Sequence, residues 1–211
     1  MTDSITITIN DDKIEANTDE TIWEVASRNN IKIPHLCHKP ADGYRPDGNC
    51  RACMVEIDGE RTLAASCIRN VNDGMVIKTE SDRATKARNM VLELLVTDQP
   101  SQVDAHDPAS TLWHFANAAE LNSSRFPQHS AAKPDSSHPA IAVNMDACIQ
   151  CGLCVRACRE VQVNDVIGLA GRGPNAHIVF DLGDDMGAST CVGCGECVQA
   201  CPTGALMPKA S

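Results

Sequence analysis

Residues 148–158 read Cys-Ile-Gln-Cys-Gly-Leu-Cys-Val-Arg-Ala-Cys, and residues 191–201 read Cys-Val-Gly-Cys-Gly-Glu-Cys-Val-Gln-Ala-Cys, followed by Pro202. Both stretches have the spacing C-x2-C-x2-C-x3-C. Three cysteines two residues apart turn tightly around one face of an iron–sulfur cubane, while the fourth is carried away on the following helix and reaches another cubane. Structural zinc sites use two separate C-x2-C pairs. The repeated run therefore favours two [4Fe–4S] clusters over zinc ions or disulfides.

This run is typical of bacterial two-cluster ferredoxins, in which each fourth cysteine serves the other cluster. The exchange predicts two crossed ligand sets, here named the Cys148 set and the Cys191 set. The Cys148 set is Cys148, Cys151, Cys154 and Cys201. The Cys191 set is Cys158, Cys191, Cys194 and Cys197. Glycines at 152, 193 and 195 lie between ligands, where the backbone must turn close to the metal.

A further group of four cysteines, the Cys37 set, lies nearer the N-terminus: Cys37, Cys50, Cys53 and Cys67. Its spacing differs from the plant-type run C-x4-C-x2-C. The flanking sequence predicts an alternating strand over residues 5–9, a helix from about residue 20 to 30 capped by Thr18, and a hairpin at residues 58–59. Strand, helix, hairpin and cysteine-rich loop predict a β-grasp [2Fe–2S] ferredoxin domain, with a zinc site as the alternative.

Two histidines, His35 and His38, flank the first cysteine of the Cys37 set. A histidine beside a metal centre can donate a hydrogen bond to it and so tune it. Because four cysteines already complete this site, we expect both histidines to be plain loop residues.

The middle of the chain has no cysteine. Residues 81–96 carry apolar side chains at helical spacing, and a second helix is expected over residues 108–121. Residues 122–139 have linker composition, in which we expect His129 and His138 to be solvated.

The predicted fold class is α+β with three parts. These are the [2Fe–2S] domain over 1–80, a helical connector and linker over 81–139, and the two-cluster domain over 140–211.

Composition excludes several classes of protein. The formal net charge is −10 and only 3% of residues are aromatic, so the chain lacks the basic patch and the stacking surface of a nucleic-acid-binding protein. No apolar run approaches the length of a transmembrane helix, and the acidic N-terminus does not resemble a signal peptide. We therefore expect a cytoplasmic protein, in which twelve cysteines indicate metal ligands.

With the three cysteine groups in this order, the chain resembles the N-terminal iron–sulfur region of the alpha subunit of NAD-dependent molybdenum or tungsten formate dehydrogenase. The large iron–sulfur subunit of respiratory complex I, the diaphorase of NAD-reducing hydrogenase and iron-only hydrogenases are similar in layout. The likeness to the formate dehydrogenase branch is carried by residues 146–162, Asp-Ala-Cys-Ile-Gln-Cys-Gly-Leu-Cys-Val-Arg-Ala-Cys-Arg-Glu-Val-Gln, and by residues 189–206, Ser-Thr-Cys-Val-Gly-Cys-Gly-Glu-Cys-Val-Gln-Ala-Cys-Pro-Thr-Gly-Ala-Leu.

This resemblance implies an electron-transfer role. Formate would give two electrons to a pterin-bound metal centre, and single electrons would pass through the cubanes and the [2Fe–2S] cluster to a flavin subunit that reduces NAD. The implied partners are a molybdenum or tungsten pterin catalytic subunit or domain and a flavin- and NAD-binding iron–sulfur subunit.

One feature of the resembled family is missing. Its members usually carry a further [4Fe–4S] site between the two domains, with the ligand pattern H-x3-C-x2-C-x5-C. Alignment puts Gln99 at the histidine position, and it puts Val103, His106 and Leu112 at the cysteine positions. We therefore expect one [2Fe–2S] and two [4Fe–4S] clusters, about ten irons per chain. The related alpha subunit also continues into a pterin-binding domain, so this chain is either a separate subunit or a fragment.

The sequence contains no candidate catalytic residues. It has no G-x-G-x-x-G segment opening a helix, no P-loop and no nucleophile–base set, so no cofactor site is expected beyond the metal ligands. The chain is expected to serve an oxidoreductase without catalysing the reaction alone. The alternatives are the diaphorase iron–sulfur subunit of an NAD-reducing hydrogenase, a stand-alone multi-cluster ferredoxin, and an iron–sulfur sensor.

Overall fold

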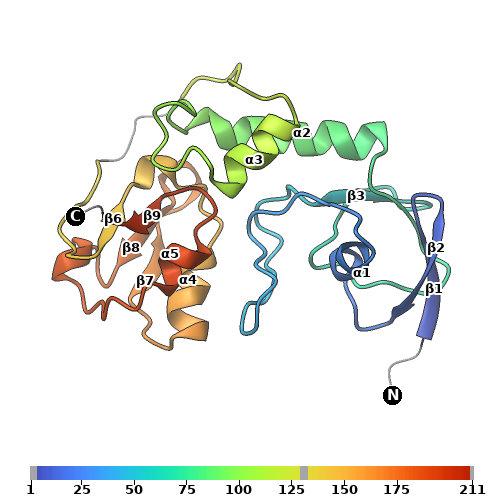
Figure 1. Ribbon diagram of the computed structural model, residues 1–211, viewed down its shortest axis with the longest axis horizontal. Helices are drawn as coiled ribbons and strands as arrows, with labels where there is room; N and C mark the ends of the chain where they lie inside the picture. Colours follow the sequence, from blue (N-terminus) through green and yellow to red (C-terminus); the bar gives the residue numbers. More distant parts are fainter. Residues whose placement is uncertain (1–3, 129–132, 210–211) are drawn as a thin grey trace. The chain divides into compact units, whose positions relative to one another are not determined.

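The computed structural model describes residues 4–128 and 133–209 (Figure 1). The chain divides into two compact units. Unit 1 consists of Met1–His38 and Pro46–Leu92, and unit 2 of Lys39–Arg45 and Glu93–Ser211. No helix in the described part of the chain is both long enough and apolar enough to cross a membrane. The domain boundaries expected from the sequence stay a prediction.

Unit 1 is built on a five-stranded sheet with the strand order β2-β1-β5-β3-β4. Strand β1 (Ser4–Ile9) pairs antiparallel with β2 (Asp12–Asn17) and parallel with β5 (Val76–Lys78). Strand β3 (Met54–Ile57) pairs antiparallel with β5 and with the short β4 (Ala64–Ala65). Alternate side chains of β1 and β3 enter the core, as the two-residue period of a half-buried strand requires.

Helix α1 (Ile22–Arg28) packs its apolar residues into the core that the sheet also lines (Figure 1). The expected cap at Thr18 is wrong, because Thr21 caps the helix. The Glu24 backbone N–H donates to the Thr21 hydroxyl at 3.2 Å, and the Thr21 backbone N–H donates to the Glu24 carboxylate at 2.8 Å. This reciprocal capping box satisfies two backbone donors that a helix start otherwise leaves unpaired.

Helix α2 (Asp82–Thr97) matches the predicted amphipathic helix to within one residue at each end. The Ser81 hydroxyl accepts the Ala84 backbone N–H at 3.2 Å, as expected for an N-cap. Helix α3 (Thr111–Ala118) is shorter than the predicted segment, because Ser110 caps it instead of the chain entering the helix at Pro108. The boundary between the two units falls inside α2, after Leu92.

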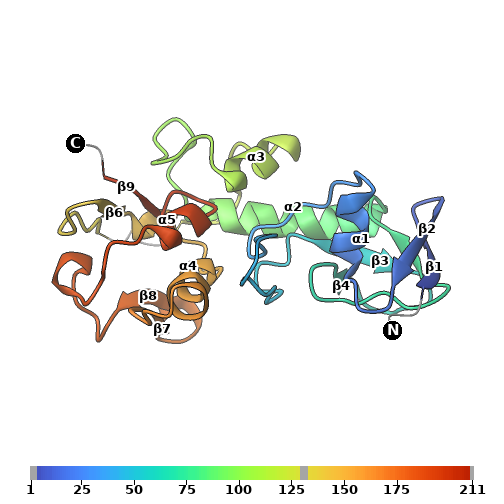
Figure 2. The ribbon, with the colours of Figure 1, turned by 60° about the horizontal axis from the view of Figure 1, so that its bottom comes forward.

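The cysteine-bearing part of unit 2 consists of short elements. Strand β6 (Ile141–Val143) pairs antiparallel with β9 (Leu206–Pro208). Strand β7 (Ile167–Ala170) pairs antiparallel with β8 (His177–Phe180). The helices in this part are α4 (Leu153–Arg156), which continues into a π-helical turn over Ala157–Val161, and α5 (Glu196–Ala200). Helix α4 contacts both α5 and β7 (Figure 2).

The segment expected to be a linker is in part an ordered element of unit 2. Asp135 forms a two-way backbone pair with Val143 in β6, and the side chain of His138 is only 6% exposed. The expectation that His138 is solvated is therefore wrong. Its ring accepts backbone N–H groups of the following residues, which compensates for the loss of water. His129 lies outside the described residues.

Candidate iron–sulfur sites

The Cys37 set is held by loops at one end of the unit 1 sheet. Cys53 lies directly before β3 and Cys67 shortly after β4, and their sulfurs are 3.4 Å apart. Cys37 and Cys50 lie on the long loop between α1 and β3, and each backbone N–H donates to the other sulfur at 3.4 Å. The Cys67 thiol also contacts that of Cys37. The structure therefore gathers all four cysteines at one place.

The protonation of these thiols is strongly interdependent. Hydrogen bonds from the thiols of Cys50 and Cys67 lower the pKa of Cys37, and a hydrogen bond from Cys67 lowers the pKa of Cys53 to about 7. The same contacts raise the pKa values of Cys50 and Cys67. Because thiolate is the form that binds metal, these four groups suit a positively charged iron–sulfur core that takes up all four charges together.

An aromatic cluster supports the loop that carries Cys37. The Trp23 indole N–H donates to the Ile33 carbonyl at 3.3 Å and lies 3.2 Å from His35 Nδ1. The rings of His35 and His38 each lie 4.6 Å from the Trp23 ring, in edge-to-face arrangements. The two histidines lie in the loop, as expected from the sequence, and their rings pack against Trp23 of α1. Trp23 itself carried no sequence signal beyond its apolar character.

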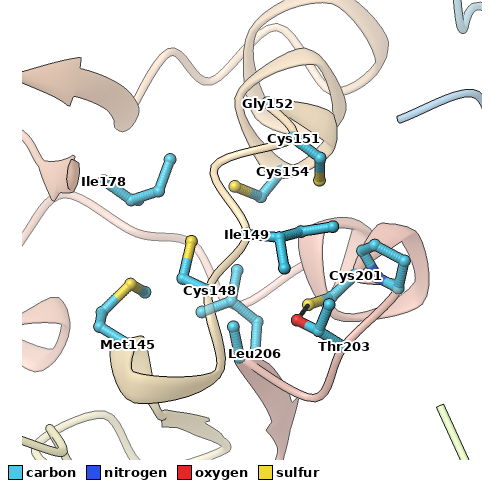
Figure 3. A pocket seen from close by; sticks show the side chains of 12 residues that line it. Met145, Cys148, Ile149, Cys151, Gly152, Cys154, Ile178, Cys201, Thr203 and Leu206 are labelled. Carbon is cyan, nitrogen blue, oxygen red and sulfur yellow. Dashed lines mark hydrogen bonds between the residues drawn. The ribbon is translucent and has the colours of Figure 1, made fainter. Parts of the chain in front are cut away.

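The Cys148 set lines a single pocket in unit 2 (Figure 3). Its cysteines come from the turn before α4, from α4 itself and from the residue after α5. The remaining wall is mostly apolar and includes Met145, Ile149, Ile178, Ala205 and Leu206. Burial raises the pKa of the Cys148 thiol to about 11, and burial together with neighbouring cysteines raises that of Cys154. Without a cationic core, such a pocket disfavours thiolates.

The Cys191 set forms a second group around α5. Burial, followed by the charges of Cys191, Cys194 and Cys158, raises the pKa of Cys197 to about 12. Backbone N–H groups point at their sulfurs. The Val166 N–H donates to the Cys158 sulfur at 3.3 Å, and the Gly193 N–H donates to the Cys191 sulfur at 3.4 Å. Hydrogen bonds to sulfur are one of the means by which a protein sets the potential of a cluster.

Cys201 lines the same pocket as Cys148, Cys151 and Cys154, and the charge of Cys158 acts on Cys197. Two glycines make these turns possible: Gly152 and Gly195 begin α4 and α5 with φ of +75° and +78°. Residues other than glycine rarely adopt this left-handed backbone conformation. No disulfide joins any of the twelve cysteines, all of which are described. Donor type, burial and N–H groups thus fit three iron–sulfur clusters, while the assignment of individual ligands stays a prediction.

The four positions aligned with the missing cluster motif have unrelated surroundings. Gln99 is buried with 7% of its surface exposed, whereas Val103 is 90% exposed. His106 Nε2 lies 3.0 Å from both carboxylate oxygens of Asp146, and Leu112 is fully buried in α3. None of these four residues offers a sulfur donor.

A short segment that follows Cys37 in the chain belongs to unit 2. The Tyr44 hydroxyl donates to the Glu196 carboxylate at 2.7 Å, and Lys39 Nζ lies 3.3 Å from the same oxygen. Arg45 pairs with Glu160 at 3.1 Å. Glu196 directly precedes Cys197, so this segment holds the start of α5 in place. The sequence reasoning missed it, because partners about 150 residues apart leave no local pattern.

Two family models match the chain and together account for all twelve cysteines. The model described as "2Fe-2S iron-sulfur cluster binding domain" matches residues 2–82. The model described as "4Fe-4S dicluster domain" matches residues 147–205. The chain accordingly carries one [2Fe–2S] cluster and two [4Fe–4S] clusters. The zinc alternative for the Cys37 set is thereby set aside.

Curated relatives are similar along nearly the whole chain. A "Putative formate dehydrogenase YrhE" of Bacillus subtilis is 31% identical over 98% of this chain and 21% of that protein. A "Probable oxidoreductase YjgC" of the same organism is 30% identical over 97% of this chain and 21% of that protein. The "NADP-reducing hydrogenase subunit HndD" of Solidesulfovibrio fructosivorans is 35% identical over 96% of this chain and 36% of that protein. The chain thus spans about a fifth to a third of the length of these relatives.

A solved structure is similar to nearly the whole of this chain as well. It is a chain of "NAD+-reducing [NiFe]-hydrogenase in the H2-reduced state", with a TM-score of 0.89 and 28% sequence identity. The match covers 99% of this chain and 89% of that chain. The matched chain is therefore similar in length to this one.

Proposed function

We infer a role in formate oxidation from the premise that this chain is an iron–sulfur electron-transfer module related to subunits of NAD-linked oxidoreductases. The proposal is that it relays single electrons between a pterin-bound molybdenum or tungsten centre and a flavin- and NAD-binding subunit of a cytoplasmic formate dehydrogenase. The observation that carries it is the similarity of 98% of the chain to a putative formate dehydrogenase. The wider relationship does not by itself name a substrate, because one electron-transfer fold serves several chemistries.

The three bound clusters supply one-electron steps, whereas formate and NAD each exchange two electrons, so partner cofactors must divide the pairs. The residues of this chain do the rest. The cysteine turns fix the position of each site, and Ile149, Ile178 and Leu206 give the Cys148 set a mostly apolar surrounding. N–H groups of Val166 and Gly193 face the sulfurs of Cys158 and Cys191, where they offset negative charge that accumulates on reduction.

A second candidate is the diaphorase iron–sulfur subunit of an NAD-reducing hydrogenase. It is favoured by a specific observation, the match to a hydrogenase chain that covers 89% of that chain. The two candidates share the relay role and differ in the metal that the partner carries.

Metal analysis of the native complex separates these candidates. The chain would be tagged in its source organism, and the complex would be captured under anaerobic conditions, with an untagged strain as control. We expect molybdenum or tungsten together with at least about ten irons per copy of this chain, and formate-dependent reduction of NAD. Nickel with hydrogen-dependent NAD reduction would replace the proposal with the hydrogenase assignment. Iron alone, with neither activity, would contradict both and favour a stand-alone ferredoxin.

A further inference from the structure

The buried His138 has no part in the ligand sets, yet its surroundings are unusually well defined. It precedes β6 and is 6% exposed. Its ring nitrogen Nδ1 accepts the backbone N–H of Ala140 at 3.2 Å and that of Ile141 at 3.1 Å. A ring nitrogen that accepts hydrogen bonds carries no proton, so the neutral imidazole has its proton on Nε2. His138 therefore has one N–H donor, at Nε2.

This donor edge faces a cysteine turn. A Cβ atom built on Gly193 would lie 3.7 Å from His138 Cε1 and 3.9 Å from Nε2. Gly193 lies between Cys191 and Cys194, and its own N–H donates to the Cys191 sulfur at 3.4 Å. The nearest atoms to the Cβ position of Gly193 thus belong to His138, so the Nε2 edge of the imidazole lies beside the turn that carries Cys191 and Cys194.

The segment that carries His138 is held firmly against the strand and loop around it. The Met186 N–H donates to the Asp135 carboxylate at 2.7 Å, and the Gly187 N–H donates to the Ser137 hydroxyl at 2.8 Å. The approach at Gly187 is close, since a Cβ there would lie 2.5 Å from the Ser137 carbonyl carbon and oxygen. Lys209 Nζ also donates to the His138 carbonyl at 3.3 Å. A donor held this way needs little reorganisation when charge on its acceptor changes.

We propose that His138 is a positioning residue that directs its Nε2–H at the Cys191–Cys194 turn and raises the reduction potential of the cluster of the Cys191 set. Reduction adds negative charge to a cluster and its sulfurs, and an N–H donor stabilises that charge. The inference rests on the proposed ligand set and on no particular substrate, so it stands or falls independently of the metal analysis described above.

Paired substitutions separate donation from packing. His138→Asn keeps a carbonyl oxygen near Nδ1 to accept the two backbone N–H groups, but it removes the Nε2 donor. His138→Gln places an amide N–H near Nε2. Redox titration of the full cluster-loaded chain, followed by EPR, should show a lower midpoint potential for one cubane in His138→Asn, with recovery toward the wild-type value in His138→Gln. The exposed His114 on α3 provides the control, and His114→Asn should leave all three potentials unchanged.

Equal midpoint potentials for the wild-type chain and a cluster-loaded His138→Asn chain would overturn the proposal. If the Asn variant fails to hold its cluster, the wild-type chain supplies the test. Pulsed EPR of protein labelled with ¹⁵N only in histidine should then show weak coupling between nitrogen and one reduced cubane, with an exchangeable proton. His138→Gln should lose the nitrogen coupling while it keeps the cluster. Absence of the coupling in the wild-type chain would equally overturn the proposal.

Discussion

At the scale of single residues, Cys158 is predicted to bind a different cluster from the other cysteines of its own run. It ends the first cysteine run, yet its thiol adds to the charge felt by Cys197, whose run begins more than thirty residues later. The Val166 N–H at 3.3 Å holds its sulfur in place. The crossed sets follow from the helix after each turn, which carries the fourth cysteine toward the other site.

Cys158→Ser should therefore destroy the cluster of the Cys191 set. We expect the iron content to fall by about four of ten atoms, while the EPR signal of the cluster held by the Cys148 set remains. Cys201→Ser is the matched variant and should remove the other cubane. Loss of the same signal in both variants, or a reversed pattern, would show that the crossed assignment is wrong.

Gln99 is a buried polar residue whose amide Nε2 has no hydrogen-bond partner among the described residues. Gln99→Met removes the buried polar group at similar volume. We expect the free energy of unfolding to rise by about 1 kcal/mol and the iron content to stay at about ten. Chemical unfolding and iron analysis check the two parts. A loss of about four irons would reveal a metal-binding role for this residue.

At the scale of elements, the ends of the helices depend on which hydroxyl begins them. For α1 both Thr18 and Thr21 stand near the start, but only Thr21 is followed at the third position by an acidic side chain, Glu24. Ion pairing at 2.8 Å between Arg28 and Glu20 then joins the last turn of the helix to the chain before it. The Arg28 hydrogen bond lowers the pKa of Glu20.

Thr21→Ala should lower the free energy of unfolding by about 1 kcal/mol, the usual cost of losing an N-cap hydroxyl. Thr18→Ala is the matched control, because Thr18 is exposed and does not cap α1. Its effect should lie within about 0.5 kcal/mol of zero. Urea unfolding of the full chain compares the two, and a larger loss for Thr18→Ala would contradict the capping geometry.

At the scale of the whole molecule, the chain passes between the two units more than once. Lys39–Arg45 belongs to unit 2, although the residues on both sides belong to unit 1. Within unit 2 the segment is fixed by Tyr44, which is 8% exposed and donates to Glu196 at 2.7 Å. Burial, followed by the hydrogen bond to the Glu196 carboxylate, raises the pKa of Tyr44, so the hydroxyl stays a donor throughout the neutral range.

Tyr44→Phe removes this donor while it keeps the ring over which Lys39 lies. Because the acceptor is charged, we expect a loss of about 1.5–3 kcal/mol in the free energy of unfolding. Lys39→Met removes a partly exposed ion pair and the charge over the Tyr44 ring, and it should cost at most about 1 kcal/mol. Thermal or chemical unfolding of both variants tests the order. If Lys39→Met were the more harmful change, the ion pair and not the tyrosine would hold the segment.

Much of the candidate site could be predicted from the sequence, because the chemistry is local. Three of the four ligands of each cubane lie within seven residues, at a spacing that the cluster imposes, and the fourth ends the other eleven-residue run. Strand β1 and helix α2 were also predictable, since their apolar residues repeat with the period of the element. The cap of α1 was misplaced, because either threonine satisfies a simple N-cap rule and only the pairing with Glu24 distinguishes them.

The sequence by itself thus determined the cluster inventory, the α+β class and the cysteines that belong to each turn. Only the tertiary structure decided the place of His138, beside Gly193 and over fifty residues away in the chain, and the attachment of Tyr44 to Glu196. Both contacts join segments that are distant in sequence, so neither leaves a periodic or motif-like pattern. Their positions follow from packing and from the need to pair buried polar groups, and these conditions exist only once the chain has folded.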